Sequence, residues 1–371
     1  MILVLSREPT LAGALASEHF VRSGVPLEVV ASGQDGLAAW RSRKPRALLL
    51  DATIEVPDPF VLAQQLRQES PAAIIVMLLP QDASAEMRKR ARGVEPDDVV
   101  FLPLEPDELF EHVAALLGLP VRRGRRVAVK LRAAVVAGAR EASGWLDNLS
   151  LQGARIRTDD ALGVGSEIVA RFGRDGAHTV EARAKVVWCQ RDEAGYTAGL
   201  QLLELDRRSR LELDQICLWD VQDRGGRVVV TVQGHLNETV RFDDLVARLA
   251  GHTEVDFDLA DVQLFNSAAV RPWSQLLEAV AGARVRYLRC SPSFTMQAAR
   301  VPDVVGHAFV CSFTVPYHCA KCQVETTRLL QRQAMQIGAD VSLPSFPCRQ
   351  CGKGKIVLDE MPEEYFRFLL T

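Results

Sequence analysis

Four cysteines in the last third of the chain have the type and spacing of a metal site. Cys319 and Cys322 form one CxxC pair, and Cys348 and Cys351 form a second. Zn²⁺ prefers four soft ligands in a tetrahedron, and the tight turn of a CxxC pair lets two thiolates reach one ion. Because four cysteines leave no open coordination position, we expect the ion to be structural rather than catalytic.

A basic segment in the first half of the chain could bind phosphate. Val121–Arg132 contains six basic residues and no acid, and Arg122, Arg123 and Arg126 lie among them. A planar guanidinium bonds phosphates and guanine edges in bidentate fashion and also stacks on purines, which an ammonium cannot do. The segment therefore favours a nucleotide ligand, with a solvated run of charge as the alternative.

A second polar motif, NxSxxG, follows at a turn between expected strands. Its Asn148, Ser150 and Gly153 offer an amide, a hydroxyl and a position where the backbone can turn tightly or approach a ligand. Together with Arg122 and Arg126, which form RxxxR, the motif resembles the PilZ domain, whose ligand is the bacterial second messenger cyclic di-GMP. The resemblance implies that the three arginines named above and these three residues bind cyclic di-GMP.

The first third of the chain alternates apolar strands with helical patterns, which predicts a doubly wound parallel sheet. The opening ILVLSREP, and Asp51 at the end of the third strand, resemble the receiver domain of response regulators, where the matching aspartate is phosphorylated. Ser6 and Arg7 replace the acids that hold Mg²⁺ in that family. We therefore expect an inactive receiver in which Asp51 is a solvated residue with local hydrogen bonds, and phosphorylation of Asp51 is the alternative.

Strands and helices alternate again between about residues 227 and 288. The runs VVVTVQGHLNE and VDFDLADVQLFNSAAV resemble STAS domains, in many of which a serine opening a helix is phosphorylated by a partner kinase. Ser267 lies at that place, although Asn266 replaces the usual acid and the usual glycine is absent. We interpret Ser267 as a helix N-cap, with phosphorylation as the alternative, and the domain as a protein-interaction module.

Between these two regions, short strands separated by turns predict a small antiparallel barrel. A helix is expected next over Asp206–Gln222, followed by a boundary at Gly225-Gly226. The fold class is thus multidomain, α/β plus β. The expected domains are a degenerate receiver-like domain over 1–118, a PilZ domain over 119–224, a STAS-like domain over 225–312 and a zinc ribbon over 313–371.

The composition is that of an ordinary globular protein, with 371 residues, 48% of them hydrophobic, and a net charge of −3. No apolar run approaches the roughly 20 residues that span a bilayer, and Met1–Ser6 lacks the basic flank of a signal peptide. We expect a cytoplasmic protein, for which a homodimer is one option.

The sequence contains no evident catalytic arrangement, such as paired carboxylates, a Ser/His/Asp order or a phosphate-binding glycine loop. We therefore expect a non-enzymatic cyclic di-GMP effector that relays ligand binding to unidentified signalling proteins. The alternatives are a scaffold that has lost the nucleotide, a phosphoprotein that uses Asp51 or Ser267, and a DNA-binding regulator. DNA binding is the least favoured of these, because few basic residues lie near the cysteines.

Overall fold

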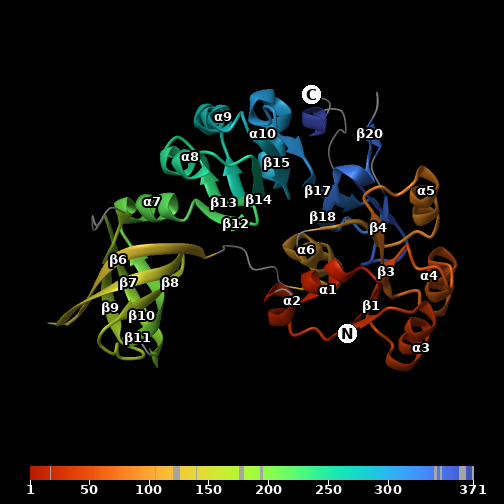
Figure 1. Cartoon of the computed structure of the whole chain (residues 1–371), viewed down its shortest axis with the longest axis horizontal. Coiled ribbons are helices and arrows are strands. Elements are labelled where there is room, and N and C mark those ends of the chain that lie inside the picture. Colours follow the sequence, from red (N-terminus) through yellow and green to blue (C-terminus); the bar gives the residue numbers. More distant parts are fainter. Residues whose placement is uncertain are drawn as a thin grey trace. The chain divides into compact units, whose positions relative to one another are not determined.

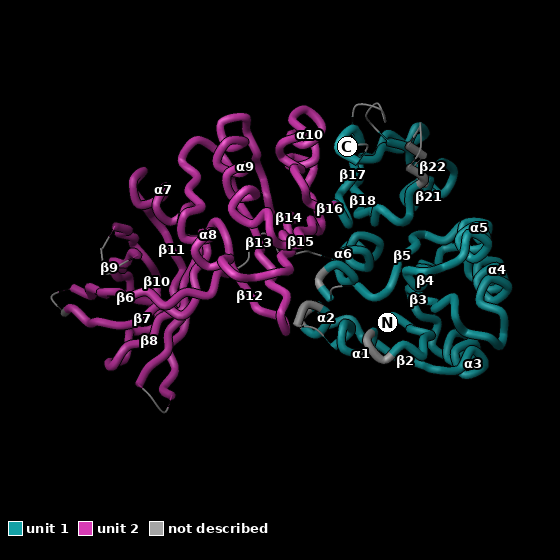
Figure 2. The backbone as a smooth tube through the Cα atoms, turned by 45° about the horizontal axis from the view of Figure 1, so that its top comes forward, with its two compact units in different colours: residues 1–121, 310–371 teal, residues 122–309 magenta. Residues whose placement is uncertain are grey.

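The computed structural model describes residues 1–16, 18–104, 106–119, 126–138, 140–174, 179–192, 195–337, 341–342, 345–358 and 365–369. The chain forms two compact units (Figure 2). One unit combines Met1–Val121 with Val310–Thr371, and the other is Arg122–Phe309. The first unit therefore joins the two ends of the chain.

A parallel five-stranded sheet forms the amino-terminal part of the first unit, as predicted. The strand order is β2-β1-β3-β4-β5, and the strands are β1 (Ile2–Leu5), β2 (Leu27–Val30), β3 (Ala47–Asp51), β4 (Ile74–Pro80) and β5 (Asp98–Leu102). Successive side chains point to opposite faces, so Ile2 and Val4 join one apolar core while Leu3 and Leu5 join another. Burial on both faces explains why these strands are continuous apolar runs.

Helices cover both faces of this sheet (Figure 1). One core is closed by α1 (Pro9–Leu15), α2 (Glu18–Ser23) and α6 (Pro106–Leu117), the last with the bounds predicted from the sequence. The other core is closed by α3 (Gly33–Arg43), α4 (Pro59–Glu69) and α5 (Ala85–Gly93). Throughout the described part of the chain, no helix is both long and apolar enough to cross a membrane.

The second unit begins with a closed antiparallel barrel, which confirms the predicted architecture of this region. Its closed order is β10-β11-β8-β7-β6-β9, from β6 (Val127–Ala137), β7 (Arg140–Ser150), β8 (Gly153–Thr158), β9 (Glu167–Phe172), β10 (Val180–Asp192) and β11 (Gly195–Leu205). Buried and exposed residues alternate along β10, because one face of the strand lines the apolar interior. Helix α7 (Arg207–Ile216) adds Leu213 and Ile216 to that interior.

The predicted helix over Asp206–Gln222 is wrong beyond residue 216. β12 (Trp219–Arg224) pairs antiparallel with β13 (Arg227–Leu236), and Gly225 and Gly226 connect them with φ of 67° and 95°. Two successive residues with positive φ make the two-residue turn that matches the twist of a hairpin. The glycine pair is therefore a hairpin turn rather than a boundary, and the division expected between residues 224 and 225 falls inside one hairpin.

A second α/β sheet follows in the order β12-β13-β14-β15-β16, with β14 (Glu254–Phe265), β15 (Arg284–Leu288) and β16 (Phe309–Val310). β13, β14 and β15 are parallel, as the alternating pattern predicts. The helices are α8 (Asp243–Leu249), α9 (Val270–Ala279) and α10 (Pro292–Arg300). In the core, the indole N–H of Trp273 donates to the Tyr287 hydroxyl at 3.1 Å and the Val304 carbonyl at 3.0 Å.

The carboxyl-terminal part of the first unit contains a four-stranded sheet in the order β18-β17-β22-β21. Its strands are β17 (Ser312–Cys319), β18 (Glu325–Gln331), β21 (Phe346–Pro347) and β22 (Lys355–Leu358), and β19 (Gln336–Ile337) pairs separately with β20 (Val341–Ser342). The buried side chain of Gln331 bonds the backbone of Phe101 in β5, accepting from its N–H at 2.6 Å and donating to its carbonyl at 3.1 Å. This amide covers part of the edge of the parallel sheet, as a further strand would.

Candidate functional site

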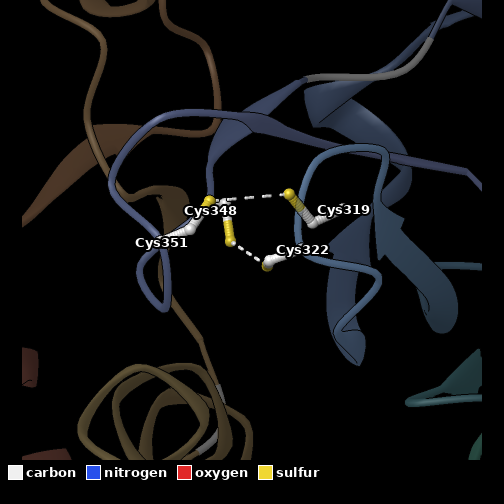
Figure 3. Close-up of side chains that lie close together, drawn as sticks. All are labelled: Cys319, Cys322, Cys348 and Cys351. Carbon is white, nitrogen blue, oxygen red and sulfur yellow. Dashed lines mark hydrogen bonds between the residues drawn. The ribbon is translucent and has the colours of Figure 1, made fainter.

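The four cysteines predicted to bind Zn²⁺ lie together (Figure 3). Their sulfur atoms all lie within 4.8 Å of one another, with 3.8 Å between Cys319 and Cys351 and 3.6 Å between Cys322 and Cys348. A tetrahedron with Zn–S bonds of about 2.3 Å has edges of about 3.8 Å, whereas a disulfide bond is about 2.05 Å long. The cluster is therefore compatible with one tetrahedral metal ion.

The two CxxC turns share one backbone design. Gln323 and Gly352 directly follow the second cysteine of their pairs and have φ of 58° and 62°. The N–H of Gln323 donates to the Cys319 carbonyl at 2.8 Å, and the N–H of Gly352 donates to the Cys348 carbonyl at 2.9 Å. Gly354 is required for another reason, since a Cβ there would lie 2.9 Å from the Cys319 sulfur. The local sequence thus leaves room for the sulfur cluster.

Backbone N–H groups favour the thiolate form at two of these cysteines. Hydrogen bonds from the N–H groups of Cys322 and Lys321 lower the pKa of Cys319 to about 6, and the N–H of Lys353 lowers the pKa of Cys351. At Cys322 a backbone N–H bond is outweighed by burial and the neighbouring thiols, so that pKa is raised. The thiolate is the form that binds metal, so these N–H groups favour metal binding at Cys319 and Cys351.

Arg349, inside the second CxxC pair, ties this turn to the amino-terminal sheet of the same unit. Its guanidinium donates to the carbonyls of Ala72 and Ala73, both at 3.1 Å, and forms an ion pair with Asp97. Asp97 is buried and also pairs with Arg67 at 2.7 Å. A buried carboxylate needs such partners. The sequence alone does not show this contact, because Asp97 is far from Arg349 in the chain.

The NxSxxG motif forms the turn from β7 to β8. The Ser150 hydroxyl accepts from the Gly153 N–H and donates to the Gly153 carbonyl, both at 3.1 Å. A Cβ on Gly153 would lie 2.7 Å from the Leu200 carbonyl oxygen. Ser150 and Gly153 therefore shape the turn and its fit against β11.

Asn148 has a different position in the same motif. Its Oδ1 is buried and has no hydrogen-bond partner among the described residues. Ala128, two residues after the exposed Arg126, is its cross-strand partner, and residues opposite each other in an antiparallel pair project to the same face. The chain from Arg126 thus enters the barrel beside Asn148. Arg122 and Arg123 lie outside the described residues.

Arg155 is a candidate ligand-binding residue that sequence reasoning missed. It lies opposite Asn148 on β8, and its Nε is 3.5 Å from an oxygen of Asp147, with no hydrogen bond of its own in the described part of the chain. Asp147 also pairs with Arg157 at 2.7 Å. The alternation of a strand could have found both arginines, because it projects residues 153, 155 and 157 to one face.

Asp51 is buried, with 4% of its surface exposed, and this corrects the expectation that it is solvated. One carboxylate oxygen accepts from the Ser6 hydroxyl at 2.7 Å. The other accepts from the N–H of Thr53 at 2.9 Å and from its hydroxyl at 2.7 Å. The predicted local hydrogen bonding is confirmed, and both oxygens are engaged by it.

Ser267 is not a helix N-cap, contrary to the sequence interpretation. The side chain of Asn266 accepts from the N–H groups of Ala268 at 3.0 Å and Ala269 at 3.2 Å, and so caps the 3₁₀ turn Ser267–Ala269 that precedes α9. The amide oxygen of Asn266 takes this place because its residue has the extended backbone that precedes a helix, with φ of −94°. Ser267 is left exposed.

Comparison with known proteins identifies one domain. Residues 120–219 match the family model described as the PilZ domain. This match confirms the PilZ prediction for the barrel region, and it suggests an effector that binds cyclic di-GMP. The match ends at residue 219, where β12 begins, so the hairpin of β12 and β13 lies beyond the matched domain.

Relatives of known description are more distant. The chain is 27% identical over 132 residues to "Probable transcriptional regulator ycf27" of Pyropia yezoensis and to the protein of the same description in Porphyra purpurea. The aligned part covers 35% of this chain and 51% of either relative, so the chain spans about half the length of the curated relatives it matches.

Similar solved structures are response regulators. One is a response regulator from Thermotoga maritima, with 16% identity, covering 32% of this chain and 96% of that chain with a TM-score of 0.29. Another is a putative response regulator from Chloroflexus aurantiacus J-10-fl, with 24% identity, the same coverage and a TM-score of 0.29.

Proposed function

We propose that this chain is a non-enzymatic cyclic di-GMP receptor that relays ligand binding to signalling proteins. The PilZ match over residues 120–219 carries the proposal. It is supported by Arg126, which enters the barrel beside Asn148, and by the unpartnered Oδ1 of Asn148. The proposed ligand contacts are Arg122, Arg123, Arg126, Asn148, Ser150 and Gly153.

Each contact has a separate chemical role in this proposal. The arginines bind the two phosphates and the guanine edges and can stack on a purine face. Asn148 pairs its amide with a guanine edge, and the turn held by Ser150 and Gly153 offers backbone N–H groups. The ligand would draw the arginine segment onto the barrel wall. It shifts the equilibrium between the free and the drawn-in segment only as far as it binds the second state better than the first.

Ligand competition tests the identity of the nucleotide. A fluorescent cyclic di-GMP is bound to the full chain and then displaced with unlabelled cyclic di-GMP, GTP or ATP. Displacement by cyclic di-GMP alone is expected, because only this ligand presents two phosphates and two guanine edges together. Equal displacement by GTP would contradict the proposal.

We also propose that Cys319, Cys322, Cys348 and Cys351 hold one structural Zn²⁺ in a zinc ribbon at residues 313–371. The support is the sulfur separations, which fit a tetrahedral ion. Elemental analysis of the purified chain is expected to give one zinc per chain and to lose it in Cys351→Ser. The matched control Cys189→Ser changes a half-buried thiol on the barrel and should keep the zinc. Retention of zinc by Cys351→Ser contradicts the assignment.

The best-supported second function is that of a phosphoprotein acting through a STAS-like domain over 225–312. The exposed hydroxyl of Ser267, at the start of a helical turn, favours it, whereas the engaged oxygens of Asp51 do not. Kinase labelling that disappears in Ser267→Ala, from a chain that binds no cyclic di-GMP, would support this function over the receptor.

A further inference from the structure

A hollow of about 620 Å³ lies in the second unit, lined by residues of β6, β12 and α8, which Figure 1 labels. Val127–Leu131, the first residues of β6, form one wall. Trp219 lies at the start of β12, and Arg248 belongs to α8. Arg174, which lies just after the end of β9, completes the basic side chains of the lining. The hollow is therefore shared between the barrel and the α/β sheet that follows it.

The charges in this lining are only partly neutralised. Arg174 forms an ion pair with Asp244 in α8. Lys130 and Arg248 are exposed, and neither has a carboxylate partner among the described residues. Asp220 is the remaining acid of the lining. Lys130 Nζ lies 5.9 Å from the Trp145 ring centroid. Within the described residues, the hollow thus offers an anion two cations that no carboxylate neutralises.

Trp219 adds a buried donor to these cations. Its ring is 4% exposed, and the guanidinium groups of Arg174 and Arg248 lie 5.3 and 5.2 Å from the ring centroid. Its indole N–H is buried and has no hydrogen-bond partner within the described ranges. A buried donor left unpaired costs free energy, which a hydrogen-bond acceptor that reaches it would recover.

One residue of the lining lies beside the proposed nucleotide site. Ala128 lines it and is the cross-strand partner of Asn148, so the two side chains project to one face. Arg126 directly precedes Val127, the first lining residue. A ligand held by Arg126 and Asn148 is therefore next to the hollow.

We propose that this hollow takes a phosphate-bearing part of cyclic di-GMP, held by Lys130, Arg248 and the N–H of Trp219. The inference rests on the proposed function and extends its binding site. Because Lys130 belongs to β6 and Arg248 to α8, the bound phosphate ties the barrel to the following domain. Ligand binding then reaches that domain without any further contact.

Calorimetric titration of the full chain with cyclic di-GMP tests the two cations. Lys130→Ala and Arg248→Ala should each weaken the affinity by about tenfold or more, since each removes a charge-assisted contact. Lys185→Ala on β10 and Arg284→Ala on β15 are the matched controls, because both residues are exposed and lie outside the hollow. They should bind as the wild type does. All four changes are at exposed positions, and unfolding in urea checks that the variants fold.

The indole N–H resonance of Trp219, assigned with Trp219→Phe, reports the hollow directly. It should move downfield when cyclic di-GMP is added to the wild type, as a new acceptor reaches the N–H. The inference is overturned if the wild type binds cyclic di-GMP but the Trp219 resonance does not move and Lys130→Ala and Arg248→Ala keep the wild-type affinity. That result leaves the receptor function intact. Absence of any binding by the wild type overturns both.

Discussion

At the scale of single residues, Gly153 shows how closely the polar turn approaches a neighbouring strand. A Cβ there would meet the Leu200 carbonyl oxygen at 2.7 Å, and backbone atoms cannot move aside cheaply. We predict that Gly153→Ala lowers the free energy of unfolding of the barrel by about 1–3 kcal/mol. Urea unfolding measures the change. Gly163→Ala is the control, because its nearest neighbour atoms lie at 3.5 Å, an ordinary contact.

His112 makes the stability of the first unit depend on pH. It is buried, and its Nδ1 lies 2.7 Å from Oδ2 of Asp98. Burial alone would lower the pKa of His112, but the charge of Asp98 and its hydrogen bond outweigh burial and raise it. The folded chain therefore holds this proton more tightly than the unfolded chain does, and the resulting stabilisation is complete only below the ordinary histidine pKa of about 6.5.

We predict from this pair that the urea midpoint of the first unit falls as pH rises above about 6.5, through the raised pKa of His112. His112→Gln should flatten this pH dependence, because glutamine does not titrate. Urea midpoints of the wild type and of His112→Gln, measured over a pH series, test this prediction. An equal slope in the variant would assign the dependence to other groups.

Residue types and spacing were enough to predict the cysteine cluster and the polar motif of the barrel. They did not separate the residues that shape the turn, Ser150 and Gly153, from Asn148, because the close approach of Gly153 to Leu200 depends on the position of β11. Nor did they predict the burial of Asp51, whose carboxylate accepts hydrogen bonds from the hydroxyls of Ser6 and Thr53. Ser6 and Asp51 lie 45 residues apart, and local spacing does not reveal a contact between residues so distant in the chain.

At the scale of elements, the second CxxC turn is held against the amino-terminal sheet by Arg349. We predict that Arg349→Ala increases amide hydrogen exchange in residues 345–358, because it removes two carbonyl bonds and the ion pair with Asp97. The cost is about 1–3 kcal/mol, as for other contacts to a buried charge. Lys353→Ala, an exposed change in the same turn, should leave exchange unchanged. Equal exchange in both variants contradicts the role of Arg349.

Helices and strands were predictable where burial produces a clear pattern of apolar residues in the sequence. Strands buried on both faces gave continuous apolar runs, and the barrel strand β10 gave an alternating pattern. The error at Trp219–Arg224 came from extending the helical pattern of α7 through a strand with mixed burial. The glycine pair that follows was the available signal, since two glycines between strands favour a hairpin.

At the scale of the whole molecule, the chain's two ends share one compact unit. The sequence order suggests four domains in series, and it contains no local signal that Gln331 bonds Phe101 or that Arg349 reaches Asp97. These pairs join elements more than 200 residues apart in the sequence. The amino-terminal parallel sheet is therefore combined with the cysteine cluster, while the barrel that matches the PilZ model lies in the other unit.

Isothermal titration calorimetry of the zinc-loaded full chain with cyclic di-GMP tests the central claim most directly. The double variant Arg122→Ala with Arg126→Ala and a titration with GTP are its controls. We predict a saturable heat for the wild type with cyclic di-GMP alone, which is abolished in a double variant that remains folded. The same affinity in the double variant, or no heat from a folded wild type, would contradict the claim that this chain is a cyclic di-GMP receptor.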